Sequence, residues 1–363
     1  MKHDYDKALV RITTILQRLY EGKVLKKSEL ALEFNVSEKT IQRDINVRLS
    51  EQPIKLVKGE GWSFDSTFLD ESLSQRYSQI ITKGKQIEYL KSSIINARDM
   101  IEQADAVLIT AGAGMGVDSG LPDFRGNDGF WKAYPPLKKI GLEFYDIANP
   151  KWFESDPRLA WGFYGHRLNL YRDTNPHIGF EILKSLTELK KENYFIFTSN
   201  VDGQFQKAGF DKDRIVEVHG SIHHNQCSQG CTGEVWSNEE TNLEVDTKTF
   251  LATNRLPTCK NCGKLARPNI LMFGDWGFSA VRRREQQERL ESWLRYNVIN
   301  KVKIVVIELG AGKIVPTVRN FSEEIHTQYN ANFIRINPKD FDGPQDAISL
   351  PLGAQEALEK IYS

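Results

Sequence analysis

The sequence predicts an α/β protein in which a domain with a mostly parallel sheet follows a small helical unit. Five short apolar runs have the length of buried strands, and they lie at 106–110, 194–197, 215–218, 302–307 and 333–336. Helical patterns separate most of these runs, and such alternation is typical of a parallel sheet with helices on both faces. Nearer the start of the chain, helical patterns are followed by one short hairpin instead.

This change of pattern divides the chain into three segments. Residues 1–65 form the helical unit, residues 66–85 a polar linker or connecting helix, and residues 86–363 the α/β domain. A length of 363 residues agrees with two domains.

The composition carries no overall charge bias. The 48 basic and 48 acidic residues cancel, so any surface for nucleic acid must be local. No apolar run approaches the roughly 18 residues of a membrane helix, and the first residues do not resemble a secretory signal. We therefore expect a cytoplasmic protein without a membrane partner.

The first 65 residues predict three helices and a hairpin. Apolar residues recur at helical spacing over 5–19, which indicates an amphipathic helix. Ser28 and Ser37 are suitable N-caps for two shorter helices. The runs 54–57 and 62–64, separated by a glycine-rich turn, predict the hairpin.

This order of elements resembles a winged helix-turn-helix, and the run VSEKTIQRDI over 36–45 is similar to recognition helices of bacterial DeoR-like and WYL-type regulators. The resemblance implies binding to operator DNA, a place on the nucleoid and, for palindromic operators, a homodimer. The side chains that can face the major groove are Lys39, Thr40, Gln42 and Arg43. A protein-interaction module is the alternative, because 12 basic and 10 acidic residues give this unit a weak positive charge.

The first strand of the α/β domain runs directly into a glycine-rich turn, AGAGMG over 111–116. A strand, a glycine turn and a helix in succession let backbone N–H groups approach a pyrophosphate. Position 117 is Val rather than Gly, so the full dinucleotide fingerprint is not present. Taken alone, the turn leaves a structural role or another phosphate ligand open.

The residues that follow extend the pattern. The stretch GAGMGVDSGLPDFRG over 112–126 resembles the sirtuin signature GAGxSxxSGIPDFRG, with departures at Gly116 and Leu121. The resemblance implies a Rossmann-like, NAD-binding domain with a small zinc-binding lobe. The NAD-pocket positions that it implies are Gly112, Ala113, Gly114, Asp123, Phe124 and Arg125.

Polar residues end the next strand, where ligands bind in open α/β sheets. The stretch TSNVDGQFQKAG over 198–209 is similar to the sirtuin motif TQNxDxLHxxAG. By this resemblance Asn200 and Asp202 are catalytic and orient the cofactor. Ser199 lies in the NAD pocket where the family has Gln, and Phe205 stands where it has His.

His219 directly follows the apolar run 215–218. A lone histidine is more often structural, but its place after the Asn/Asp motif matches the sirtuin general base. An imidazole with a pKa of about 6.5 suits proton removal at neutral pH. His223 and His224 are expected to be loop residues rather than metal ligands.

All four cysteines of the chain form two close pairs. Three residues separate Cys227 from Cys231, two residues separate Cys259 from Cys262, and 27 residues lie between the pairs. This spacing suits a tetrahedral zinc site in a module over about 222–266. Four sulfur ligands close the coordination shell, so the zinc is expected to be structural.

Four later segments resemble further sirtuin positions. Residues 267–275 resemble the segment beside which an extended peptide adds as a strand. The family resemblance implies NAD contacts after the last strands, at Gly310, Ala311, Gly312, Asn337 and Ala354.

Three functions agree with these patterns. The first is a DNA-binding regulator with a catalytic, NAD-dependent protein-lysine deacylase domain that acts on an acylated protein. The second is a transcriptional repressor that senses NAD or ADP-ribose with little turnover. The third is an ADP-ribosyltransferase or NAD hydrolase. His219 supports the first, which we expect, whereas Gly116, Ser199, Phe205 and the DNA-binding module favour the second.

Overall fold

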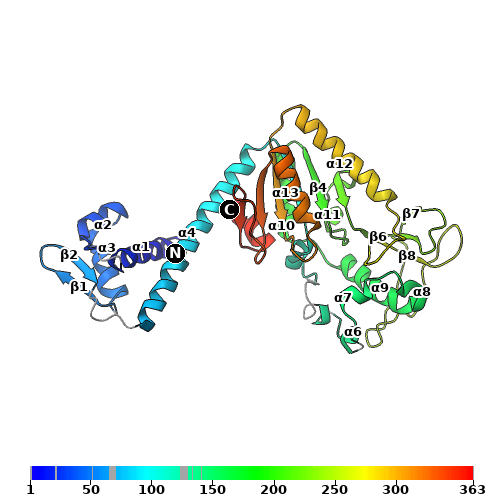
Figure 1. Ribbon diagram of the computed structural model, residues 1–363, viewed down its shortest axis with the longest axis horizontal. Helices are drawn as coiled ribbons and strands as arrows, with labels where there is room; N and C mark the ends of the chain where they lie inside the picture. Colours follow the sequence, from blue (N-terminus) through cyan, green and yellow to red (C-terminus); the bar gives the residue numbers. More distant parts are fainter. Residues whose placement is uncertain are drawn as a thin grey trace. The chain divides into compact units, whose positions relative to one another are not determined.

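The computed structural model describes residues 2–20, 23–50, 52–64, 71–122, 130–132, 134–139 and 141–362. The chain divides into two compact units, Met1–Ser92 and Ser93–Ser363, which are considered separately below (Figure 1). No helix among the described residues combines the length and the apolar character that crossing a bilayer requires.

The smaller unit packs helices against a two-stranded sheet. Its elements before residue 65 are α1 (Lys2–Tyr20), α2 (Lys27–Glu33), α3 (Glu38–Arg43), the π-helical turn η1 (Asp44–Arg48), β1 (Ile54–Val57) and β2 (Gly61–Phe64). The two strands pair antiparallel, from Ile54 opposite Phe64 to Val57 opposite Gly61. The core residues of the unit include Ile15, Leu16, Leu19, Leu30, Ile41, Ile45 and Trp62.

The two predicted helix caps in this unit have different outcomes. The Ser37 side chain accepts a hydrogen bond from the Thr40 backbone N–H at 3.2 Å, so it caps α3 as predicted. The prediction for Ser28 is wrong, because α2 begins at Lys27 and its N-cap is Lys26, two residues before the predicted cap. The cause is tertiary: Leu25 exchanges backbone hydrogen bonds with Trp62, and the chain can enter the helix only after that bridge.

Of the segment 66–85, residues 71–85 are helical and belong to α4 (Glu71–Gln103). This stretch contains no proline and a single glycine, so nothing in it ends a helix. Of the two predicted alternatives, residues 71–85 thus form the connecting helix, while residues 66–70 lie outside the described part of the chain. The division between the two units falls within α4, after Ser92, rather than at residue 86.

The larger unit is built on a parallel sheet. Within the described residues the strand order is β11 (Ile348–Leu350), β10 (Asn332–Ile336), β9 (Ile304–Leu309), β3 (Ala106–Ala111), β4 (Tyr194–Thr198) and β5 (Ile215–Glu217). Every neighbouring pair is parallel. This confirms the predicted α/β class and adds the short strand β11.

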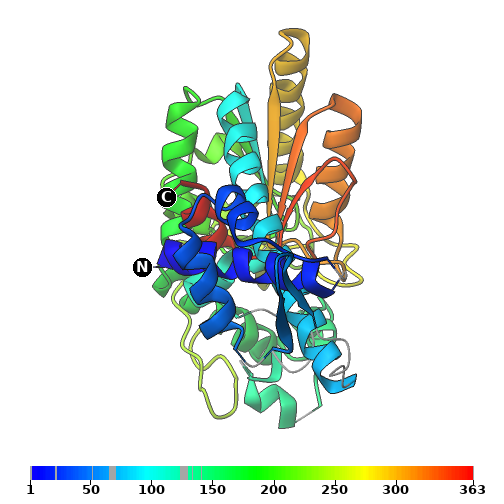
Figure 2. The same cartoon turned by 90° about the vertical axis from the view of Figure 1, so that its left-hand side faces the viewer.

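Helices cover both faces of this sheet. Leu290 and Leu294 of α12 (Val281–Ile299) and Val318 and Ile325 of α13 (Thr317–Tyr329) share one core with the strands. The end of α4, α10 (Ile178–Leu189) and α14 (Ala354–Tyr362) lie on the other side (Figure 2).

A second core and a small antiparallel sheet form the smaller lobe of this unit. Its sheet has the order β7 (Val235–Ser237), β6 (Gly220–Cys227) and β8 (Ala266–Ile270). The helical elements in this part of the chain are α6 (Pro135–Lys139), α7 (Phe144–Ile147), α8 (Trp152–Ser155) and α9 (Pro157–Asp173). Trp161 on α9 joins the two parts of the lobe by donating its indole N–H to the Ala266 carbonyl at 3.0 Å.

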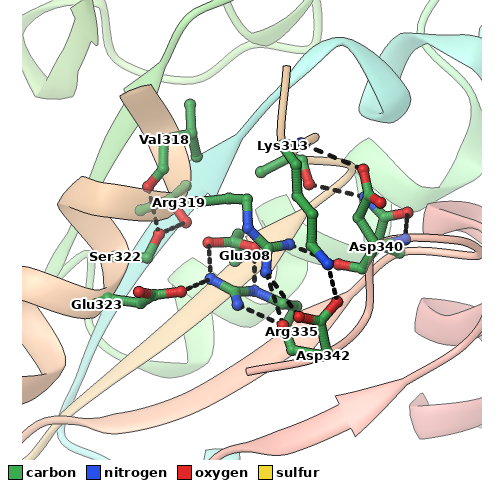
Figure 3. A network of polar contacts seen from close by, with 12 residues as sticks. Glu308, Lys313, Val318, Arg319, Ser322, Glu323, Arg335, Asp340 and Asp342 are labelled. Atoms are coloured by element: carbon green, nitrogen blue, oxygen red, sulfur yellow. Dashed lines mark hydrogen bonds and ion pairs between the residues drawn. The ribbon is translucent and has the colours of Figure 1, made fainter. Parts of the chain in front are cut away.

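A row of polar side chains crosses the parallel sheet beneath α13 (Figure 3). The strand register places Glu308 between Thr110 and Arg335. Arg335 and Glu308 are both fully buried and form a two-point ion pair, at 2.5 Å from Nε and 3.0 Å from Nη2. Burial opposes the charge of Arg335, but the carboxylates of Glu308 and Glu323 outweigh it and raise the pKa of Arg335.

Replacing Arg335 by Met should destabilise the larger unit by about 3–5 kcal/mol, because Glu308 would keep a buried charge without its partner. Urea unfolding followed by tryptophan fluorescence measures the change. The double variant Glu308→Gln, Arg335→Met should recover part of the loss. As a control, Lys313→Met removes an exposed ion pair with Asp342 and should cost less than about 1 kcal/mol. Equal effects of Arg335→Met and Lys313→Met would contradict this account.

Candidate active site and metal centre

The predicted site residues gather at one edge of the parallel sheet, because the carboxyl ends of parallel strands share an edge. Strand β3 delivers the glycine turn, β4 delivers the polar stretch that starts at Thr198, and β5 leads to His219. Strands β9 and β10 lead to Gly310 and Asn337 at the same edge.

The glycine turn packs directly on the loop after β9. Gly112 and Gly114 donate backbone hydrogen bonds to the carbonyls of Leu309 and Gly310 at 2.9 and 3.0 Å. A Cβ on Gly112 would lie 2.7 Å from the Ala311 Cα, and one on Gly310 would lie 2.4 Å from the Gly114 carbonyl carbon. Glycine is therefore required at both positions. The segment that follows is a 3-10 helix, η3 (Ala113–Ser119), and not the expected α-helix.

The Asn337 side chain joins the loops after β9 and β10. It is fully buried, donates from Nδ2 to the Ala311 carbonyl at 2.8 Å, and accepts from the backbone N–H groups of Lys339 and Asp340. Lys313 and Asp342 add an ion pair between the same two loops at 2.7 Å (Figure 3). Asn337 thus shapes this part of the predicted NAD site by holding its backbone.

Asp118 connects the glycine turn to the last helix. Its carboxylate accepts a hydrogen bond at 2.9 Å from the backbone N–H of Gln355, in the first turn of α14. Ala354, which is predicted to contact NAD, is the buried first residue of that helix.

His177 stabilises the glycine turn by a side-chain hydrogen bond. Its Nδ1 accepts from the Gly179 N–H, so its Nε2 carries the hydrogen and donates to the Met115 carbonyl at 3.0 Å. Burial lowers the pKa of His177, which keeps this neutral form at neutral pH.

The polar end of β4 is tied to the glycine turn. Asn200 donates from Nδ2 to the Gly112 carbonyl at 2.9 Å, and Ser199 donates its backbone N–H to the Ala111 carbonyl at 3.2 Å. The Asp202 carboxylate accepts from the Gln204 N–H at 2.9 Å, and burial raises the pKa of Asp202 to about 6. Its Oδ2 lies 3.7 Å from where a Cβ on Gly116 would be placed.

Apolar packing explains why Phe205 departs from the motif. Its ring is buried and lies edge-on to the rings of Phe180 and Phe210, at 5.0 and 5.5 Å between centroids. A polar imidazole would lose this packing.

His219 lies between two segments that are far apart in the sequence. Its carbonyl accepts from the Leu271 N–H at 2.9 Å, and its Nε2 lies 3.4 Å from the Thr317 hydroxyl. Burial and, to a smaller extent, the charge of Arg283 lower the pKa of His219, while a hydrogen bond with the Ser199 backbone opposes them. The ring is therefore neutral at neutral pH, the form that a general base requires.

His223 and His224 are part of strand β6, so their prediction as loop residues is wrong. The register of β6 with β8 shifts between Ser221 and Asn225. The two histidines lie in this irregular part of the strand pairing. The His223 Nε2 lies 2.8 Å from the Asp202 carbonyl.

A cavity of about 820 Å³ lies beside Asp202, and sequence reasoning missed it. Its lining includes His223 and His224 from β6 and Arg282 from α12. No local motif marks it, because its residues come from elements far apart in the chain.

The predicted NAD-pocket residues Asp123, Phe124 and Arg125 lie outside the described residues. The structure therefore gives no position for them.

The four cysteines converge at the end of the small sheet. Their Sγ atoms all lie within 4.8 Å of one another, with Cys227 3.6 Å from Cys262 and Cys231 3.6 Å from Cys259. A tetrahedral zinc with Zn–S bonds of about 2.3 Å places its sulfurs about 3.8 Å apart. The observed cluster fits that geometry, and its four thiolates leave no position for a substrate.

Comparisons with known proteins agree with this geometry. A family model described as the Sir2 family matches residues 112–291. An NAD-dependent protein deacylase of Pyrococcus furiosus is 31% identical over 220 residues, which cover 60% of this chain and 76% of that protein. One of Leptospira interrogans is 31% identical over 186 residues and one of Aquifex aeolicus 32% over 175 residues; these matches cover 51% and 48% of this chain. The chain spans 66% and 64% of the length of those two relatives.

Solved structures show the same fold at low sequence identity. A Sir2 homologue in a complex with ADP-ribose has a TM-score of 0.55 at 24% identity and covers 74% of this chain and 94% of its own. A Sir2 homologue–NAD complex has a TM-score of 0.54 at 22% identity, with coverages of 74% and 92%.

Purified protein should contain one zinc ion per chain, and Cys259→Ser should lose it. The loss should lower the melting temperature by several degrees, because each 1 kcal/mol corresponds to about 2–4 °C in a domain of this size. Elemental analysis and thermal unfolding measure both effects. His224→Ala is the matched control and should keep the metal. Full zinc content in the Cys259→Ser protein would contradict the assignment.

Proposed function

Because the chain belongs to the Sir2 family, we propose that it is an NAD-dependent protein-lysine deacylase joined to a DNA-binding module. The observation that carries the proposal is His219, which is partly buried, neutral and placed at the edge of the sheet where the glycine turn and Asn200 meet. The relatives from Pyrococcus furiosus and Leptospira interrogans that carry the name NAD-dependent protein deacylase support the reaction class.

The residues at the sheet edge fit a dinucleotide. Glycines and alanines follow β3 and β9, namely Gly112, Ala113, Gly114, Gly310, Ala311 and Gly312. Residues without long side chains let a diphosphate approach the backbone closely. When bound, NAD would supply a ribose carbon that releases nicotinamide as the acyl oxygen of the substrate bonds to it, so that the acyl group ends on a hydroxyl of ADP-ribose and the lysine amine is freed.

The chain's own residues would hold the reactants and move one proton. His219 accepts a proton at its ring from a sugar hydroxyl, and the low pKa of the ring keeps it ready to do so at neutral pH. Asn200, held by the Gly112 carbonyl, and Asp202, held by the Gln204 N–H, orient the cofactor. The four-cysteine zinc site braces the small lobe and takes no part in the chemistry.

Incubation with NAD and an acetyl-lysine peptide should release nicotinamide. His219→Ala should lower kcat/KM by about 100-fold or more, the usual contribution of a general base. The acid limb of the pH profile should have its midpoint below 6.5, because the pKa of His219 is lowered and activity requires the neutral ring.

His326→Ala is the control, since His326 pairs with Asp346 on the surface of α13. Nicotinamide release without any peptide would indicate NAD hydrolysis, and release that survives His219→Ala would exclude the proposed base.

We also propose that the smaller unit binds operator DNA as a winged helix-turn-helix. Its α3 exposes Lys39 and Arg43, while Ile41 is buried in the core. Asp44 is fully buried and accepts hydrogen bonds from Arg11 and Arg48, both at 2.5 Å, which fixes the rotation of the helix about its axis. Thr40 and Gln42 are partly exposed beside them, and a dimer would match a palindromic operator.

A sensor that binds NAD or ADP-ribose with little turnover is the second candidate function. A series of contacts favours it: Asp118 of the glycine turn binds the first turn of α14, and the Ile361 and Lys360 carbonyls at the other end of α14 accept the Arg98 guanidinium at 2.5 and 3.3 Å. Arg98 lies on α4, the helix that continues into the smaller unit. Ser199, in place of the family's Gln, also favours slow turnover.

Arg43→Ala should weaken binding to a selected operator about tenfold in fluorescence anisotropy, because it removes a base or phosphate contact. Lys23→Ala, outside the proposed recognition helix, serves as the matched control. If the sensor function holds, ADP-ribose should change operator affinity in the unaltered protein, and Arg98→Ala should abolish that change while DNA binding persists. An operator affinity that ADP-ribose leaves unaltered would exclude sensing.

A further inference from the structure

Exposed apolar side chains lie on both segments that flank His219. Leu271 donates its backbone N–H to the His219 carbonyl and the Thr317 hydroxyl lies 3.4 Å from its ring, so the segments 271–279 and 310–317 each contact His219 at one end. On the first segment the Trp276 ring is completely exposed, and on the second Ile314 is 77% exposed. An indole ring that is exposed to water has a higher free energy than one that is buried. Tryptophan is also among the residues enriched at the centre of protein interfaces.

The backbone on either side of Trp276 is held rigidly. The Asp275 carboxylate forms a two-point ion pair with the buried Arg267 at 2.7 and 2.8 Å and accepts from the Gly277 N–H at 3.0 Å. The Gly277 carbonyl in turn accepts from the Gln226 side chain at 2.7 Å. A side chain displayed on a fixed backbone loses little entropy when it binds a partner.

A cation stands next to this segment without a matching anion. The first turn of α12 contains Arg282, Arg283 and Arg284, no acidic residue and no side-chain cap, although the helix dipole disfavours cations there. Arg282 is explained by its ion pair with the buried Glu217.

Among the described residues, Arg283 has an aromatic partner and no ionic one: its guanidinium lies 5.6 Å from the centre of the Phe278 ring. A Phe278 ring carbon lies 3.1 Å from where a Cβ on Gly220, the neighbour of His219, would be. The charge of Arg283 therefore stands near His219, in agreement with the lowered pKa of that ring.

We propose that Trp276 and Arg283 select the protein substrate, by binding a bulky apolar side chain and an acidic side chain that flank the acyl-lysine. This inference rests on the proposed deacylase function. The residues proposed for NAD follow β3, β4, β9, β10 and β11, whereas Trp276 and Arg283 follow β8 of the small lobe. Their place after β8, apart from the loops proposed for NAD, assigns them to the acyl donor rather than to the cofactor.

The test uses four acetyl-lysine peptides that combine Glu or Gln at one flanking position with Leu or Ala at the other. The full-length protein, Arg283→Gln and Trp276→Ala are compared at pH 8, where His219 is neutral. We expect the KM of the unaltered protein to be about tenfold lower for Glu than for Gln and for Leu than for Ala, as for contacts of about 1.4 kcal/mol. Arg283→Gln should remove only the preference for Glu, and Trp276→Ala only the preference for Leu.

The controls are Arg295→Gln and Tyr296→Ala, which change exposed side chains farther along α12. Both variants should keep both preferences. Peptide affinity is measured in parallel by fluorescence anisotropy, so a protein that binds with these preferences but releases no nicotinamide would refute the deacylase function alone. Equal KM values and affinities for the four peptides would overturn the selection proposal. A rise in the KM for NAD in Arg283→Gln, with the Glu preference intact, would overturn it as well.

Discussion

The parallel register of the sheet is the constraint on which the rest of the structure depends. Because the strands β3, β4, β5, β9 and β10 all point the same way, five loops from distant parts of the chain end at one edge. Asn200 then binds the loop of β3, and Asn337 joins the loops of β9 and β10. The buried pair of Glu308 and Arg335 fixes the register beneath those loops, since a one-residue slip of either strand would turn its charged side chain to the opposite face, away from its partner.

The sequence allowed the local parts of this arrangement to be predicted. The glycine turn, the polar end of β4 and the cysteine pairs are short patterns whose spacing is set by backbone geometry or by a metal. The α/β class followed from strand-sized apolar runs alternating with helical patterns. The structure confirmed that class and brought the four cysteines together.

Features that depend on tertiary contacts could not be predicted. The pairing of Glu308 with Arg335 joins residues 27 apart in the chain, and no local pattern indicates it. Strand β11 has only three residues, too few for a pattern. The exposed state of Trp276 and the unmatched charge of Arg283 become visible only when their surroundings are known. The α-helix expected after the glycine turn is a 3-10 helix, held by Asp118 and His177 to elements far along the chain.

The contact between the glycine turn and the loop after β9 limits how this site can evolve. A Cβ at Gly112 would enter the backbone near Ala311, and one at Gly310 would enter the backbone of Gly114. Two side chains in contact can change together, with a larger one compensated by a smaller one. Where two backbones are in contact, neither has a side chain that could become smaller. These glycines should therefore not covary with any partner. Among descendants of this sequence they should stay unchanged or be lost together with the site.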